Sequence, residues 1–234
     1  MSAIPAGFIP AFLAGLLLNM SIAGAALLLG LACGGPLALL RLGGGAPGRL
    51  AGMLTGLLRV APTFVVMFFL LNLLPPVARL GPWSVPLHGA VAVVLSLVVY
   101  AAAYVSDTAL EALRHWRAGA HDLSLLFLPA LARAFFVLVM ASSAGAAIGV
   151  TEAVTVTLRQ AQALGSVGDR LLLFGAVILC FTCLLQGAFL GVDRLRRHLV
   201  ARRPRPAPGG ASQQTYGPLS ARCPAPPGPS EPVS

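Results

Sequence analysis

Charge is scarce in this 234-residue sequence: only 10% of the residues are Asp, Glu, Lys or Arg, and lysine is absent. A soluble domain typically carries about 25% charged residues, so this chain has too little charge to cover a water-facing surface. Hydrophobic residues make up 57% of the sequence. The 16 basic residues are all arginines, and they separate long apolar runs instead of lining one face as nucleic-acid binding would require. These features exclude a soluble enzyme, a disordered chain and a nucleic-acid-binding domain, and they indicate an integral membrane protein.

Residues that usually carry chemistry are also few. Cys180 and Cys183 have no second cysteine pair or histidine near them in an uncharged segment, so we interpret them as small apolar residues. The histidines are scattered, and the sequence contains neither a Gly-rich phosphate loop nor a Ser-His-Asp order. We therefore expect no catalytic residues, no metal site and no cofactor.

Apolar segments near the length of a membrane span, roughly 20 residues, occur along most of the chain. We predict spans at residues 11–32, 53–74, 87–105, 134–151 and 171–192. The second is the weakest, because residues 60–74 alone are short and full length requires extension back through Arg59. The predicted fold class is all-α: a polytopic transmembrane helical bundle of about five spans within residues 1–203.

The positions of the arginines predict the orientation, because cytoplasmic loops retain positive charge. With the N-terminus outside, the outer loops contain only Arg79, Arg159 and Arg170, and most other arginines lie inside. We therefore predict an N-out, C-in topology. Residues 204–234 are rich in Pro, Gly, Ser and Ala and poor in large apolar residues, so we predict a disordered cytoplasmic tail there.

Several short motifs follow one another in a recognisable order. They are Gly30, Gly34 and Leu40-Arg41-Leu42; Arg59-Val60-Ala61-Pro62; Ala102-Ala103-Tyr104 with Asp107; Ile148-Gly149-Val150 with Glu152; and Arg159-Gln160-Ala161-Gln162. Over about residues 12–200 this order resembles that of bacterial ABC-transporter permeases for polar amino acids. The resemblance implies an inner-membrane permease subunit, without catalysis of its own, that forms a substrate pathway with a second permease copy. It also implies a separate ATPase subunit and a periplasmic binding protein as partners.

Two departures from that family favour an alternative. The family's ATPase-docking loop carries a Glu-Ala-Ala motif with a downstream Gly, but residues 103–129 are too short to hold it. Polar Gln and Glu residues usual in the second span are replaced by Val66 and Gly56. The alternative is a degenerate, non-transporting permease-like subunit that acts as a structural or assembly component of a larger membrane complex.

Polar residues and a proline within the predicted spans are candidates for the substrate pathway. They are Arg59, Pro62, Tyr100, Tyr104, Ser142 and Ser143. A proline frees backbone carbonyls, which together with a guanidinium could hold a substrate carboxylate. The alternatives are an interfacial anchor for Arg59, and likewise for Arg133, and helix packing for the tyrosines and serines.

Contacts with partners are predicted from two further groups of residues. The loop candidates are Glu111, Arg114, His115, Trp116 and Arg117, where Trp beside Arg is typical of an interface, although an interfacial aromatic belt is an equal alternative. The helix-packing candidates are Gly30, Gly34, Gly145 and Gly149, which could serve packing within the chain or against a partner. Membrane lipids are expected partners, and residues 194–205 form a basic run that retains the C-terminus inside or binds anionic headgroups.

Overall fold

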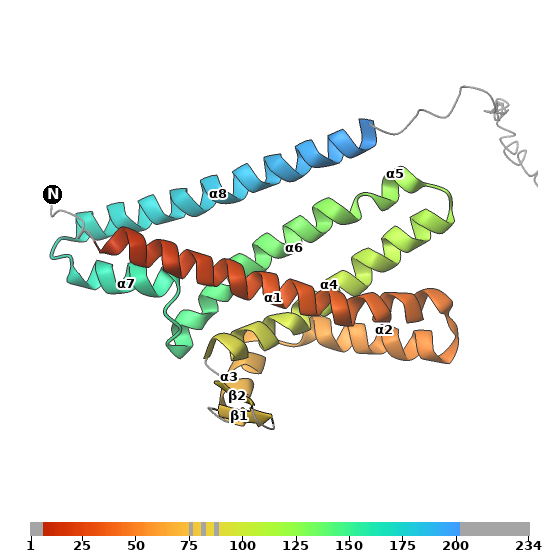
Figure 1. The fold of residues 1–234 in the computed structure, drawn as a ribbon, viewed down its shortest axis with the longest axis horizontal. Coiled ribbons are helices and arrows are strands. Elements are labelled where there is room, and N and C mark those ends of the chain that lie inside the picture. Colours follow the sequence, from red (N-terminus) through yellow and green to blue (C-terminus); the bar gives the residue numbers. More distant parts are fainter. Residues whose placement is uncertain (1–6, 75–76, 81–82, 87–88, 202–234) are drawn as a thin grey trace, which may run out of the picture.

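The computed structural model describes residues 7–74, 77–80, 83–86 and 89–201, so the predicted tail at 204–234 lies outside the described residues. The described part is helical except for one short pair of strands (Figure 1). The elements in chain order are α1 (Phe8–Gly43), α2 (Gly45–Val60), α3 (Thr63–Leu73), β1 (Val77–Leu80), β2 (Trp83–Pro86), α4 (Gly89–Arg117), α5 (His121–Ser124), α6 (Phe127–Ser142), the 3-10 helix η1 (Ser143–Ile148), α7 (Ala153–Ala163) and α8 (Val167–Ala201).

Helices α1 and α4 pack closely together at the centre of the bundle. A Cβ atom added to Gly30 would lie 2.5 Å from Ala101 Cβ, and one added to Gly34 would lie 2.5 Å from the Ala102 carbonyl oxygen. Small residues let helix backbones approach in this way, which increases van der Waals contact in a lipid environment. Gly30 and Gly34 therefore pack within the chain.

The other two predicted packing glycines lie near the end of α6. A Cβ on Gly145 would be 3.1 Å from Val150 Cβ and 3.3 Å from Val93 Cγ2, so Gly145 also sits in a tight contact. Gly149 differs from its predicted packing role. Its φ is +84°, it ends η1, and no heavy atom lies within 4 Å of the position of an added Cβ. Its function is the left-handed turn, a conformation that side chains other than glycine rarely adopt.

The predicted second span is a bent pair of helices. Helix α2 begins at Gly45 and α3 ends at Leu73, and their axes meet at 91°. Ala61 and Pro62 are extended, with ψ values of 120° and 114°, and Val66 N donates to the Pro62 carbonyl at 3.1 Å to begin α3. Proline has no backbone N–H and disrupts the preceding helical turn, which explains why the break falls here.

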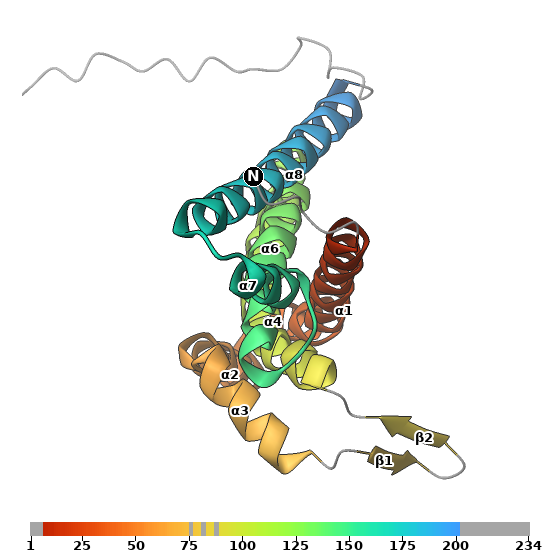
Figure 2. The same ribbon diagram turned by 90° about the vertical axis from the view of Figure 1, so that its left-hand side faces the viewer.

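A small antiparallel hairpin between α3 and α4 was not predicted. In it Val77 is opposite Pro86 and Leu80 is opposite Trp83. The hairpin and α3 lie at one edge of the bundle, whereas α8 lies at the opposite edge, with α4 and α6 between them (Figures 1 and 2).

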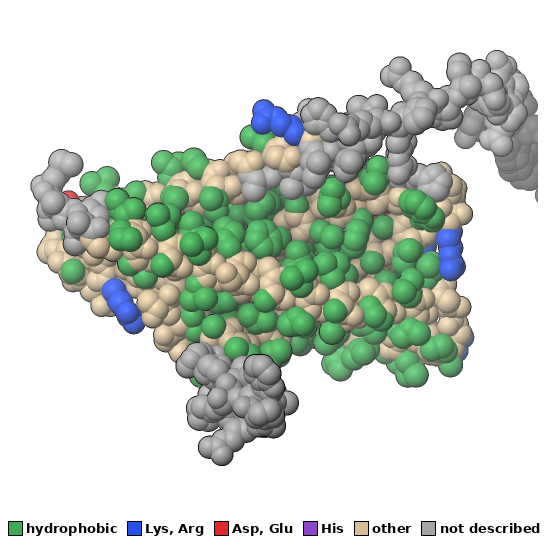
Figure 3. All heavy atoms as spheres, viewed as in Figure 1, with side chains coloured by type: hydrophobic (Ala, Val, Ile, Leu, Met, Phe, Trp, Pro, Cys, Tyr) green, Lys and Arg blue, Asp and Glu red, His purple; other side chains and the backbone are tan. Residues whose placement is uncertain are grey.

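The surface of the bundle confirms a multi-pass membrane protein. The helices Phe8–Gly43, Gly89–Arg117, Phe127–Ile148 and Val167–Gly191 are each long and apolar enough to cross a membrane, and the α2–α3 pair adds a fifth span if counted as one. Hydrophobic side chains cover much of the face shown in Figure 3, and basic side chains occur mainly toward its ends. Leu172 and Ile178 of α8 are 72% and 65% exposed, which a water-soluble protein would rarely repeat along a helix.

Candidate functional site

A cavity of about 590 Å³ opens beside the break between α2 and α3. Its wall combines the start of α3 (Pro62, Thr63), one face of α4 (Val93, Ser96) and the junction of α6 with η1, including Ser143. The hydroxyl of Ser96 donates to the Val93 carbonyl at 2.8 Å, so its hydrogen is used within its own helix. The lining is mainly apolar, and a molecule in this cavity would meet only a few hydroxyl and backbone groups.

Behind Ser143 lies a buried polar cluster that joins α1 to the start of α7. Asn19 Nδ2 donates to Ser143 Oγ at 3.4 Å and to Glu152 Oε2 at 3.1 Å, and Asn19 Oδ1 accepts from Ala153 N at 3.4 Å. Asn19 and Glu152 are both 0% exposed. Burial of a carboxylate without hydrogen-bond partners costs free energy, so the partners of Glu152 determine its role.

The Glu152 carboxylate is held by hydrogen-bond donors. Besides Asn19, it accepts from Val154 N at 2.9 Å, from Thr155 N at 2.8 Å and from Thr155 Oγ1 at 3.0 Å. It therefore caps the N-terminus of α7, where free N–H groups and the helix dipole both favour negative charge. Its role in this geometry is to hold α7 against α1. Glu152 stands out in the sequence only as part of a family motif, and no local pattern pairs it with Asn19, 133 positions away.

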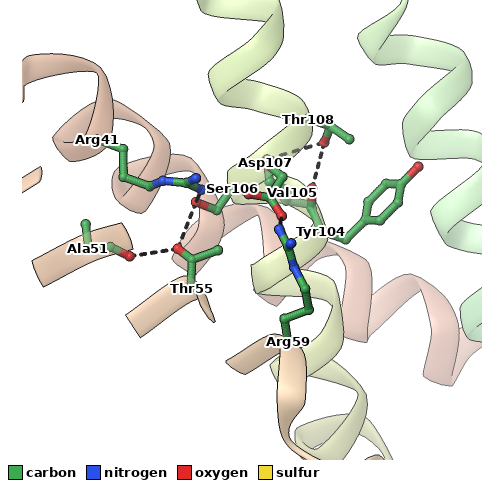
Figure 4. Close-up of polar contacts among 9 residues, drawn as sticks. All are labelled: Arg41, Ala51, Thr55, Arg59, Tyr104, Val105, Ser106, Asp107 and Thr108. Carbon is green, nitrogen blue, oxygen red and sulfur yellow. Dashed lines mark hydrogen bonds and ion pairs between the residues drawn. The ribbon is translucent and has the colours of Figure 1, made fainter. Parts of the chain in front are cut away.

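A second polar cluster joins α1, α2 and α4 (Figure 4). Asp107 of α4 accepts from Arg41 Nη1 at 2.8 Å through Oδ1 and from Arg59 Nη2 through Oδ2. Arg41 Nη1 also donates to Ser106 Oγ at 3.0 Å, and the Ser106 and Thr55 hydroxyls lie 3.2 Å apart. One carboxylate thus connects the end of α1 to the end of α2, just before the Pro62 break.

The structure brings together only part of the predicted substrate pathway. Pro62 and Ser143 line the cavity, whereas Ser142 is buried and donates to the Val139 carbonyl at 2.7 Å. Arg59 does not line the cavity; it is bound to Asp107 and its side chain is 64% exposed.

Tyr100 and Tyr104 also lie outside the lining of the cavity. Their rings stack with centroids 6.0 Å apart, one and two turns beyond Ser96 along α4. Figure 4 shows the Tyr104 side chain directed away from the Asp107 cluster. These two side chains pack against each other instead of forming a wall of the cavity.

The predicted partner loop is divided between two faces of α4. Glu111 and His115 line a hollow of about 170 Å³ against α5 and α6, with His115 Nε2 3.8 Å from Glu111 Oε1. Arg114 lines a different hollow, toward α1 and α2. Trp116 is 55% exposed near the end of α4, and Arg117 is the exposed last residue of that helix. The helix that follows, α5, has only 4 residues.

Comparison with known proteins gives one informative similarity. No protein-family model matches the chain, and no curated protein matches it in sequence. Among solved structures, the fold is similar to that of a chain in the crystal structure of an amino acid ABC transporter with histidines, with a TM-score of 0.56 and 19% identity. The similarity covers 84% of this chain and 95% of that one. The protein is therefore a multi-pass helical membrane protein, and its fold resembles that of a chain from an amino acid ABC transporter.

Proposed function

We propose that this protein is the transmembrane permease subunit of an amino-acid-type ABC importer in the bacterial inner membrane. The observation that supports this most directly is the fold similarity, which extends over 95% of the transporter chain. In this proposal the subunit is N-out and C-in. It forms the substrate pathway with a second permease copy, and a separate ATPase and a periplasmic binding protein complete the importer.

The cavity beside Pro62 is our candidate for this chain's part of the pathway. Broken helices are common at substrate sites of transporters, because backbone groups freed at the break become available to a ligand. At the cavity wall, Thr63 lies in the first turn of α3, where backbone N–H groups have no partner within the helix, and Ser143 adds a hydroxyl from the junction of α6 and η1. Arg59 is bound to Asp107 and does not line this cavity, so it is not part of the candidate pathway.

The end of α4 and the start of α6 form our candidate contact with the ATPase. The hollow at Glu111 and His115, together with Leu123 of α5, offers a concave surface at that end of the bundle. Because α5 has only 4 residues, this contact surface is smaller than the ATPase-docking loop that the family resemblance implies. That observation favours the second candidate function, a permease-like subunit that no longer transports and supports the assembly of a larger membrane complex.

Co-purification from native membranes distinguishes the two functions. We expect the tagged protein to retain an ATPase subunit and a binding protein, and L123E to lose the ATPase because a charge replaces a 47% exposed apolar side chain on α5. The matched control is L158E, which makes the same change at a 42% exposed leucine of α7, near the other end of the bundle. Recovery of a stable complex that contains neither an ATPase nor a binding protein would favour the structural subunit.

Uptake measurements test the pathway itself. Labelled histidine is a suitable first probe, because the similar transporter was crystallised with histidines. We expect A144W to abolish uptake by filling the cavity, and A176W to retain it because Ala176 is exposed on α8 outside the cavity. Equal uptake by both variants, with both folded and inserted, would contradict the assignment of the cavity.

A further inference from the structure

A basic hollow, which we call the arginine pocket, lies where α1 ends, α2 begins and α4 passes beside them. It has a volume of about 360 Å³ and is lined by Arg41, Arg49 and Arg114, by three glycines and by Leu110. Its wall is therefore made largely of guanidinium groups and backbone. Of all the hollows described, this one has the lining most suited to an anion.

The turn between α1 and α2 brings the backbone to the pocket wall. Gly44 and Gly45 have φ values of +71° and +68°, a conformation that suits glycine, and Gly44 gives the start of α2 no side-chain cap. The carbonyl end of α1 lies beside the N–H end of α2, so their helix dipoles oppose each other. The positive potential of the pocket therefore comes from the arginines.

Two of the three arginines have no partner among the residues that the structure describes. Arg41 is paired with Asp107, which Arg59 also engages, so one carboxylate is shared by two guanidinium groups. The side chains of Arg49 and Arg114 make no hydrogen bond or ion pair within the described part of the chain.

The nearby acid on α4 does not reach the pocket. Glu111 lies on the face of α4 toward α5 and α6, where it is paired with His115. Among the residues that the structure describes, the charged groups that line the arginine pocket are thus Arg41 from α1, Arg49 from α2 and Arg114 from α4, without a carboxylate.

Positive charges that face the same hollow repel each other, and a bound anion offsets this electrostatic repulsion. Guanidinium groups match phosphate oxygens particularly well, because their planar fork donates two parallel hydrogen bonds. The pocket also lies at the end of membrane-spanning helices, where basic hollows between helices bind phosphate-bearing headgroups. We propose that the arginine pocket binds a phosphate group, held chiefly by Arg49 and Arg114. The phosphate could belong to an anionic lipid or to a free phosphate ester.

Native mass spectrometry of the purified full chain in detergent tests this proposal without requiring transport. The probes are phosphatidylglycerol, glycerol phosphate and inorganic phosphate. The comparison without net charge is zwitterionic phosphatidylcholine, in which a choline cation offsets the phosphate. The test variant is R49A/R114A. The matched control, R133A/R194A, removes two exposed arginines outside the pocket and changes net charge equally. Unchanged thermal midpoints in detergent establish that both variants are folded.

We expect one phosphate-bearing probe to bind to the native chain, and its affinity to fall about tenfold or more in R49A/R114A and less than about twofold in R133A/R194A. Preference for phosphatidylglycerol over glycerol phosphate identifies a lipid headgroup, and equal affinity identifies a free phosphate compound. Binding of phosphatidylcholine as tightly as phosphatidylglycerol overturns the proposal. So does an equal loss in both double variants, or a loss of ATPase co-purification in R49A/R114A with no change in phosphate binding.

Discussion

Glu152 and Asn19 stand 133 positions apart in the sequence, yet their side chains meet in the interior at 3.1 Å. In E152A the cap of α7 is lost, and the donors of Asn19, Val154 and Thr155 lose their acceptor in a buried place. Together these losses predict a decrease of about 3 kcal/mol in the free energy of unfolding. Denaturant titration in mixed detergent micelles measures it.

The matched control for this prediction is E111A. The Glu111 side chain is 76% exposed, and its ion pair within the described part of the chain is the one with His115 at 3.8 Å, so its removal is expected to change stability by less than about 0.5 kcal/mol. Equal stability of E152A and E111A would show that the buried cluster does not secure α7 to α1.

The two arginines bound to Asp107 differ in burial, and their effects on stability should differ accordingly. The side chain of Arg41 is 21% exposed and also donates to Ser106, whereas that of Arg59 is 64% exposed. We expect R41A to lower the free energy of unfolding by about 1–2 kcal/mol, and R59A by less than about 0.5 kcal/mol, with high salt removing the second effect. A larger and salt-insensitive effect of R59A would contradict this ordering of the two contacts.

Among the elements, the close packing of α1 on α4 depends on glycines in α1, which have no side chain to separate the two helices. G34A would place a methyl group 2.5 Å from the Ala102 carbonyl oxygen, so we expect a loss of about 1–3 kcal/mol of stability. Gly24 of the same helix has no heavy atom within 4 Å of an added Cβ. G24A should therefore be neutral or gain up to about 1 kcal/mol from helix propensity. The unfolding free energies of the two variants, measured side by side, check this, and equal losses would show that α1 does not approach α4 as closely as described.

The long helices were predictable because an apolar run of bilayer length is a local property of the sequence. The predicted segments 11–32 and 171–192 lie within α1 and α8, which extend beyond them at both ends. Helix α4 begins at Gly89 and continues past the predicted end at 105 to Arg117, whereas the segment predicted at 134–151 runs beyond the end of η1 at Ile148. The early start of α2 was harder to predict from the sequence, because residues 43–48 are rich in glycine, which has low helix propensity. Pro62 indicated a break, but the 91° angle depends on what α3 packs against.

The polar clusters were less predictable for a different reason. Arg41 and Arg59 lie 66 and 48 positions from Asp107, and no local pattern states which charged side chains will meet. The same holds for the cavity, where Pro62 and Ser143 were foreseen as pathway residues but their neighbours on α4 were not. Spacing along a helix predicts a face, whereas the identity of the facing helix depends on tertiary packing.

Across the whole molecule, the two ends of the bundle differ in charge, which predicts how it is inserted. Arg49 and Arg114 stand at the end where α1 meets α2 and α4 meets α5, whereas Arg159 belongs to α7 at the other end. Positive charge is retained on the cytoplasmic side, so the turn between α4 and α5 should be cytoplasmic and the turn between α7 and α8 should be outside.

Cysteine labelling in a background without native cysteines tests this orientation. Ala118 and Ser166 are exposed residues in the two turns. We expect S166C to react with a membrane-impermeant thiol reagent in intact spheroplasts, and A118C to react only after the membrane is permeabilised. The reverse pattern would place the arginine-rich end outside and contradict the N-out, C-in topology. An ATPase subunit is cytoplasmic, so that result would also exclude α5 as the contact with the ATPase and would contradict the proposed importer function. Phosphate binding by the arginine pocket would not be affected, because it is tested separately.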